Sequence, residues 1–73
     1  GEIIKINEDL YLLKSSLEQA KGVLIKLINE NGSISVGEFR DVLNANRKVS
    51  IGLLEYFDGI KLTKRDGEKR VLI

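Results

Sequence analysis

Residues 46–73 constrain the fold most strongly, because a helical pattern is followed at once by a hairpin signal. Residues 46–59 carry apolar side chains at helical spacing, which predicts one helix. Residues 62–72 surround Asp66-Gly67, a dipeptide typical of the two-residue turn of a β-hairpin. The end of the chain is therefore predicted to be a helix and an antiparallel hairpin in close succession.

Basic residues are concentrated in the same part of the chain. Residues 47–73 hold seven Lys and Arg against four acidic residues, whereas residues 1–46 hold five against seven. Arg47 and Lys48 fall in the first turn of the predicted helix, where the helix dipole disfavours a cation by about 0.3–1 kcal/mol. The exposed backbone N–H groups of a helix start also suit a phosphate. We therefore interpret these charges as retained for an external anion, the phosphates of a nucleic acid.

The predicted turn decides which side chains of the hairpin lie opposite one another. With this turn, Lys64 faces Lys69 and Arg65 faces Glu68. Like charges directly opposite on a hairpin are destabilising, so Lys69→Glu is expected to stabilise the free hairpin, and a bound phosphate would relieve the lysine pair. Two alternatives stay open: Arg65 pairs with Glu68 at the turn, and Arg70 lays its apolar stem over the core edge.

The first part of the chain predicts a pair of short strands and a helix. Residues 2–6 and 10–13 are apolar runs separated by polar residues, which suits a strand pair. Ser15, with Glu18 three residues later, has the spacing of a capping box and predicts a helix start, and Gly32 is expected to end that helix. The predicted buried stripe consists of Leu17, Ala20, Leu24, Leu27 and Ile28.

Two further helices are predicted from their caps. A short strand at residues 33–34 precedes Ser35, which forms a second capping box with Glu38, and Asn46 is a good N-cap for the last helix. Gly59 is expected to end that helix in the left-handed conformation. The predicted inward side chains are Val36, Phe39, Val42 and Leu43 in one helix and Val49, Leu53, Leu54 and Phe57 in the other.

These elements predict the α+β class. The expected architecture is a single winged helix-turn-helix domain over residues 1–73, with three helices, a small antiparallel sheet and a C-terminal β-hairpin wing. The inferred stripes and the hairpin account for the apolar residues, so a monomer is expected.

Composition excludes several classes of function. The chain has no Cys and no His, which removes thiol chemistry, the usual neutral-pH base and the commonest metal ligand. No apolar run approaches the roughly 18 residues of a membrane span. Acidic residues recur at helical spacing along the predicted helices, and ion pairing at the surface explains them better than acid–base catalysis. We therefore expect a binding domain without cofactor or metal, not an enzyme.

The ordered set of motifs resembles a known family. The segments are EIIKINEDLY (2–11), SVGEFRDVL (35–43), RK (47–48), LLEYFD (53–58) and TKRDGEKRVL (63–72). Together they are similar to the carboxy-terminal winged-helix domain of SelB, the bacterial selenocysteine-specific elongation factors. The resemblance spans nearly the whole chain.

The resemblance implies a function for the domain. It would be the last of several tandem winged helices behind a GTPase, docking the selenocysteine insertion (SECIS) hairpin of mRNA so that selenocysteine is inserted at UGA. The ribosome, selenocysteinyl-tRNA and GTP would be partners through other domains, in the cytoplasm. The RNA-binding residues carried over from the family pattern are Arg47, Lys48, Lys64, Arg65, Lys69 and Arg70.

Two other functions fit a winged helix. A DNA-binding domain of a transcription regulator would place the helix of residues 46–59 in the major groove. Beyond its first turn, however, the outward side chains are Ile51, Glu55 and Asp58, which are poor groups for reading bases beside phosphates. A protein-interaction domain of a larger assembly would show no affinity for nucleic acid even at low salt.

Overall fold

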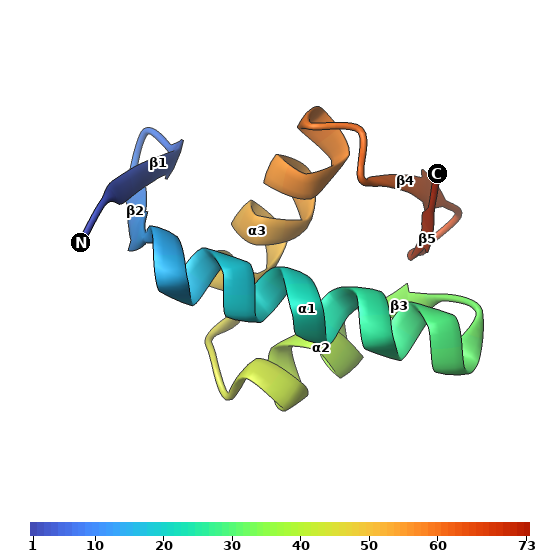
Figure 1. Cartoon of the computed structure of the whole chain (residues 1–73). Coiled ribbons are helices and arrows are strands. Elements are labelled where there is room, and N and C mark those ends of the chain that lie inside the picture. Colours follow the sequence, from blue (N-terminus) through green and yellow to red (C-terminus); the bar gives the residue numbers. More distant parts are fainter.

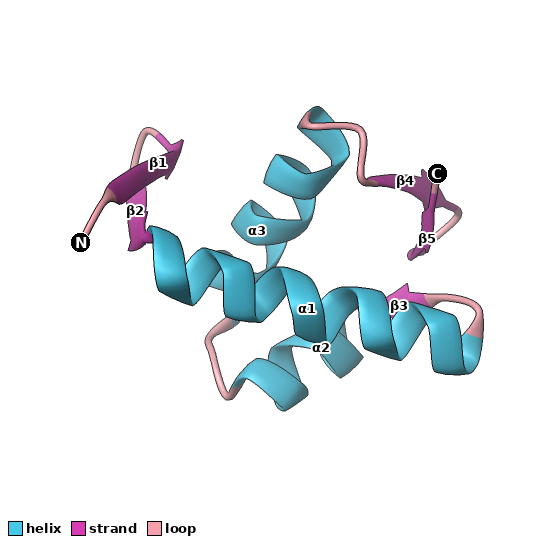
Figure 2. Cartoon of the chain, in the orientation of Figure 1, coloured by secondary structure: helices cyan, strands magenta, loops and turns pink.

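The computed structural model describes residues 1–73, and its three helices and five short strands confirm the predicted fold class. In chain order the elements are β1 (Ile3–Asn7), β2 (Leu10–Leu13), α1 (Lys14–Asn31), β3 (Ile34–Ser35), α2 (Val36–Leu43), α3 (Arg47–Gly59), β4 (Thr63–Asp66) and β5 (Lys69–Leu72). Figure 1 shows α1 running along the molecule, with the β1–β2 hairpin beyond its start. In Figure 2 the β1–β2 hairpin lies beside the start of α1, and the β3, β4 and β5 strands lie towards its other end.

The strands form two separate antiparallel sheets. One is the β1–β2 hairpin, and the other has the order β3-β5-β4. We call the β4–β5 hairpin the wing. The short strand β3 holds the wing against the helices, because Ile34 pairs with Arg70 and Ser35 with Lys69. None of the three helices has the length and apolar content that crossing a bilayer requires.

Helix α1 begins two residues before the predicted start and without the predicted capping box. Its N-cap is Leu13, which offers no side-chain cap, so Ser15 and Glu18 do not form the box expected from their spacing. The β1–β2 hairpin supplies a partner instead, because the Lys14 backbone N–H donates to the Glu2 carbonyl at 2.8 Å. The strand therefore continues directly into the helix, and the hairpin backbone satisfies the first of the free N–H groups at the helix start.

The core lies where the three helices meet. Its buried apolar side chains are Ile6, Leu17, Ala20, Leu24, Ile28, Ile34, Phe39, Leu53, Leu54 and Phe57. Leu24, Phe39, Leu54 and Phe57 have no exposed surface, and complete burial of such a side chain contributes about 1.5–3 kcal/mol. Most of the predicted stripes are thus confirmed, although Leu27, Val36, Leu43 and Val49 are only half-buried.

Two details of the helices differ from the prediction. Val42 is 53 % exposed, because it lies about 100° around α2 from its neighbour Leu43, at the margin of the inward stripe. Gly59 is the last residue of α3 and has no positive φ, whereas Lys61 does, at 66°. The left-handed residue falls there because it turns the chain so that the Leu62 N–H bonds to the Phe57 carbonyl at 3.0 Å and the Leu62 side chain packs on the core.

Gly52 lets the first hairpin approach α3. This residue is buried, and a Cβ atom at its position would lie 2.9 Å from Asn7 Nδ2 and 3.4 Å from Leu10 Cδ2. The absence of a side chain therefore allows the β1–β2 turn to pack directly on the helix backbone, close to the basic residues at the start of α3.

Candidate nucleic-acid interface

The turn between α2 and α3 fixes the start of the basic helix. Asn44 adopts the left-handed conformation, with φ 53°, and the backbone N–H of Ala45 bonds to the Arg40 carbonyl at 3.2 Å. Asn46 then caps α3 as predicted, because its Oδ1 accepts from the Val49 N–H at 2.8 Å. The buried Ser50 hydroxyl donates to the Asn46 carbonyl at 2.9 Å, which ties the cap to the second turn.

Arg47 and Lys48 occupy the first two positions of α3, and both side chains are exposed. No acidic side chain lies within ion-pair distance of either. They therefore keep their charge beside the positive end of the helix dipole without an internal partner, as predicted.

The wing has a different register from the one predicted. Its turn is Gly67-Glu68, so Asp66 faces Lys69, Arg65 faces Arg70 and Lys64 faces Val71. Gly67 has φ 63° and Asp66 is not in the left-handed region, which matches a turn with glycine at its first central position. The predicted Asp66-Gly67 turn would have required Asp66 to adopt a positive φ, which is costly for a side-chain-bearing residue.

In this register Lys64 and Lys69 are not opposite one another, so the predicted repulsion between them does not arise. Lys69 instead has Asp66 across the strand pair, and its Nζ lies 4.0 Å from Oε1 of Glu38. The proposed pairing of Arg65 with Glu68 is also absent, because Arg65 Nε donates to the Gly67 carbonyl at 3.2 Å.

The corrected register reverses the expected effect of Lys69→Glu. The substitution would place a carboxylate opposite Asp66 and beside Glu38, so the free domain should lose about 0.5–1 kcal/mol of stability rather than gain it. Urea unfolding of the variant measures this loss. Lys64→Glu is the matched control, since Lys64 faces Val71 and the change should stay within about 0.5 kcal/mol. A stabilised Lys69→Glu variant would argue for the register expected from the sequence.

One carboxylate at the end of α3 holds both strands of the wing. Oδ2 of Asp58 accepts from Nε and Nη2 of Arg70 at 3.1 and 3.0 Å. Oδ1 of Asp58 accepts from the Thr63 hydroxyl at 2.6 Å. Arg70 is only 6 % exposed, so its guanidinium is committed to Asp58 and little of it faces solvent. Arg70 thus joins the wing to α3 through its guanidinium.

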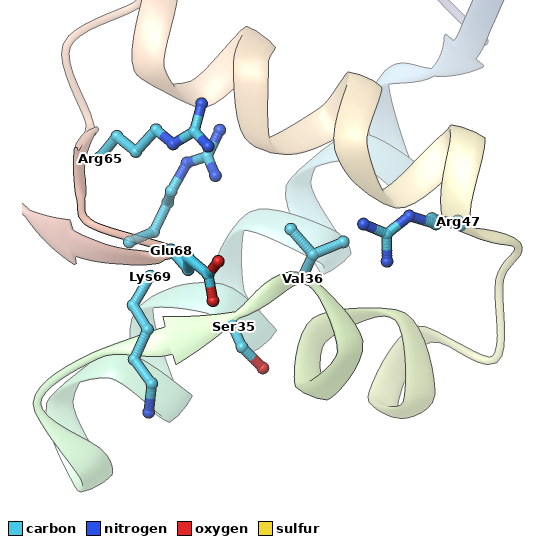
Figure 3. A pocket seen from close by; sticks show the side chains of 7 residues that line it. Ser35, Val36, Arg47, Arg65, Glu68 and Lys69 are labelled. Atoms are coloured by element: carbon cyan, nitrogen blue, oxygen red, sulfur yellow. The ribbon is translucent and has the colours of Figure 1, made fainter.

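Four of the six predicted RNA-binding residues line one hollow of about 330 Å³ between the wing and the helices. Its lining residues are Ser35, Val36, Arg47, Arg65, Glu68, Lys69 and Arg70. In Figure 3 the Arg47 guanidinium points into it from α3, while Lys69 points away along β3. Lys48 lies outside this hollow, in a groove shared with Asn7, and Lys64 lies outside both. The lining residues that the sequence did not predict are Ser35, Val36 and Glu68. Ser35 and Val36 reach the hollow because β3 pairs with β5, and Glu68 because the wing turn is Gly67-Glu68.

The start of α2 at the edge of the hollow is held by a complete capping box. The Glu38 N–H donates to the Ser35 hydroxyl at 3.1 Å, and the Ser35 N–H donates to the Glu38 carboxylate at 3.0 Å. The backbone hydrogen bond from Ser35, then its side chain and the charge of Lys69, lower the pKa of Glu38. Because this pKa is lower in the folded state, the stabilisation is present above the ordinary glutamate pKa of about 4.3 and is lost as the pH falls through the folded value.

Ser35→Ala should therefore destabilise the domain by about 0.5–2 kcal/mol at neutral pH. The difference from the natural protein should shrink as the pH falls, because protons then compete with these hydrogen bonds for the Glu38 carboxylate. Urea unfolding of the variant and of the natural protein at pH 7 and at pH 3 measures the loss of stability and its change with pH. Ser33→Ala is the matched control, because the Ser33 side chain makes no hydrogen bond. An equal loss at both pH values would contradict the role of the Glu38 charge.

The chain has no group of three acidic, His or Cys side chains placed to hold a metal ion. A helix-turn-helix followed by an antiparallel wing, with cations at the start of the last helix, defines a winged-helix domain of the nucleic-acid-binding type. The profile of the family described as "Elongation factor SelB, winged helix" matches residues 26–72. The chain belongs to this family.

Known proteins of the family match almost the full chain. It is 34 % identical over 70 residues to a selenocysteine-specific elongation factor of Desulfomicrobium baculatum and 36 % over 72 residues to that of Escherichia coli. The chain spans only 11–12 % of the length of these relatives. It also matches the solved mRNA-binding domain of elongation factor SelB from E. coli in complex with SECIS RNA, with a TM-score of 0.88 and 36 % identity. That match covers 96 % of this chain and 58 % of the solved chain.

Proposed function

We propose that this domain binds a structured mRNA hairpin, a SECIS element, and works by binding rather than by catalysis. The observation that carries the proposal is the match, at a TM-score of 0.88 and 36 % identity, to a chain solved in complex with SECIS RNA. The cation-lined hollow between the wing and α3 supports it independently, because RNA backbone is a dense row of phosphates.

Different residues have different roles in this proposal. Arg47 and Arg65 contact phosphates across the hollow, and Lys69 contacts them at its rim. Lys48 and Lys64 lie outside the hollow and attract the RNA backbone on either side of it by their charge. Arg70 is a positioning residue, since its guanidinium is held by Asp58. The domain grips RNA near a loop or bulge, because the major groove of an RNA helix is too narrow for α3.

The proposed RNA binding has a role in the parent protein. As part of a selenocysteine-specific elongation factor, the domain tethers the factor to mRNA for selenocysteine insertion at UGA. It is one of several winged helices, the last in the tandem series, while GTP, selenocysteinyl-tRNA and the ribosome are bound through other domains. This proposal implies a cytoplasmic location and a monomeric domain.

A binding titration tests the RNA-binding proposal. A labelled RNA hairpin with a bulge and a duplex DNA of matched length are titrated with the domain at several salt concentrations. We expect tighter binding to the RNA, with an affinity that falls steeply as salt rises. Equal or stronger binding to the DNA would overturn the proposal in favour of a transcription regulator, and no binding at low salt would favour a protein-interaction domain.

A further inference from the structure

A groove of about 420 Å³ lies between the β1–β2 hairpin and α3, beside the hollow described above. Its lining residues are Asn7, Arg47, Lys48, Ile51, Gly52 and Glu55. We call it the β1–α3 groove. Arg47 lines both the groove and the hollow, and no other residue does. An RNA backbone that lies on Arg47 can therefore continue from the hollow into the groove along the protein surface.

The charged groups of the groove lie on one face of α3. Lys48, Gly52 and Glu55 follow one another at spacings of four and three residues, so they form a row along the helix. Lys48 and Glu55 are at the two ends of this row, two turns or roughly 10 Å apart along the axis. Both side chains are exposed, and neither makes an ion pair. The groove therefore offers a cation at one end and a carboxylate at the other, and both are available to a ligand.

Asn7 places a free donor over the middle of this row. The strand register shifts between Lys5 and Asn7, and such a bulge re-aims a side chain. Oδ1 of Asn7 accepts from the Asp9 backbone N–H at 2.9 Å, which leaves the amide nitrogen Nδ2 on the side of α3. A Cβ atom on Gly52 would lie 2.9 Å from this nitrogen, so the missing side chain makes room for it. Nδ2 of Asn7 donates to no group of the protein.

These three groups match the hydrogen-bonding groups of an RNA backbone. Phosphate oxygens accept hydrogen bonds, which suits the ammonium of Lys48 and the amide of Asn7. A carboxylate only accepts, so Glu55 repels a phosphate and needs a donor. The 2′-hydroxyl of ribose is such a donor, and it is present in RNA but absent from DNA.

We infer that the β1–α3 groove binds one ribose and an adjoining phosphate of the RNA stem, with Glu55 accepting from the 2′-hydroxyl and with Lys48 and Asn7 on the phosphate. Glu55 thus distinguishes RNA from DNA at this position, and the β1–β2 hairpin contacts RNA together with the wing. An RNA helix displays its 2′-hydroxyls along a wide, shallow minor groove, so α3 reaches them without entering the major groove.

This inference rests on the proposed RNA binding, and its test separates the two. The bulged RNA hairpin of the titration is prepared with a 2′-fluoro group at one stem nucleotide at a time. Fluorine keeps the sugar shape of RNA but cannot donate a hydrogen bond. We expect one stem position at which the substitution weakens binding to the natural domain by about tenfold, the effect of one hydrogen bond to a charged group.

Variants of Glu55 identify the acceptor. Glu55→Ala should bind the hairpin substituted at that position and the unmodified hairpin equally well. Glu55→Gln keeps a carbonyl acceptor and should retain part of the difference. Glu30→Ala is the matched control, because Glu30 is an exposed carboxylate on α1 that lies outside the groove and makes no ion pair. This control should keep the full difference.

Asn7→Asp tests the contact from the β1–β2 hairpin. The substitution keeps the acceptor for the Asp9 N–H, and so the turn, but it removes the free donor and brings a negative charge to the phosphate. It should weaken RNA binding by about tenfold or more. Asn29→Asp is the matched control, since it adds the same charge at an exposed position of α1 outside the groove, and its affinity should stay within about twofold. Unchanged affinity of Asn7→Asp would overturn the inference.

The remaining outcomes are also decisive. If the natural domain binds no hairpin, the proposed function itself fails. If it binds but no 2′-fluoro position weakens binding, or if Glu55→Ala keeps the same sensitive position, the inference is overturned while RNA binding stands. A Glu55→Ala variant that binds every hairpin more tightly by the same factor would make the carboxylate merely repulsive, which also overturns the inference.

Discussion

Replacing Asp58 with alanine is expected to lower the free energy of unfolding by about 3 kcal/mol, a large part of the stability of a domain this small. The substitution removes the acceptor of two hydrogen bonds from Arg70 and one from Thr63, and it leaves a guanidinium buried without a counter-charge. We place the loss at the lower end of the range for buried ion pairs, because the Asp58 side chain is 27 % exposed. Urea unfolding monitored by circular dichroism measures it.

Glu55→Ala is the matched control for this prediction. Glu55 is an exposed acidic residue one turn earlier in the same helix and makes no ion pair, so its removal should change stability by less than about 0.5 kcal/mol. Replacing both members of the pair, as Asp58→Leu with Arg70→Met, should recover part of the loss, since no charge then stays buried. The role assigned to Asp58 fails if Asp58→Ala is no less stable than Glu55→Ala.

The double variant Arg47→Ala, Arg65→Ala is expected to bind RNA about a hundredfold more weakly than the natural domain. Each arginine is proposed to supply a charge-assisted contact worth about 1.5 kcal/mol, and about 1.4 kcal/mol corresponds to a tenfold change in affinity. The slope of log affinity against log salt should also become shallower by about 1.5, because two phosphate contacts are lost. Fluorescence anisotropy at four or five salt concentrations gives both values.

Lys5→Ala with Lys26→Ala is the control of equal net charge. Both lysines are exposed, and neither lines the hollow. This variant should retain most of the affinity and salt slope. A similar loss of affinity in the two double variants would mean that RNA binding depends only on the net charge of the domain. The fold should survive the loss of Arg47, because removing a cation from a helix start does not destabilise it.

Local rules of backbone chemistry predicted most of the fold. The capping residues Ser35 and Asn46 act as their sequence context predicts, because each needs only its own side chain and the next three residues. Ser15 has the same signature as Ser35, yet it caps nothing, since the preceding hairpin already fixes the start of α1. A partner twelve residues away in the sequence overrides the local preference, and spacing alone does not reveal it.

The wing shows why the candidate site was predicted only in part. Asp66-Gly67 and Gly67-Glu68 are both acceptable two-residue turns, and the choice between them moves every cross-strand partner. The basic composition of the wing does not depend on that choice, so the sequence locates its cations as a group. The partner of each one does depend on it, which is why the burial of Arg70 and the free carboxylate of Glu68 were not foreseen.

The attachment of the wing to α3 through a single carboxylate has a consequence for the speed of RNA capture. A hairpin that swings freely must be ordered on binding, at about 0.5–1.5 kcal/mol for each flexible side chain that is immobilised. Here Thr63 and Arg70 hold the wing on Asp58 before any ligand arrives, so the wing and the helix meet RNA as one rigid body. Encounter can then be limited by diffusion and long-range charge attraction rather than by a slow rearrangement of the protein.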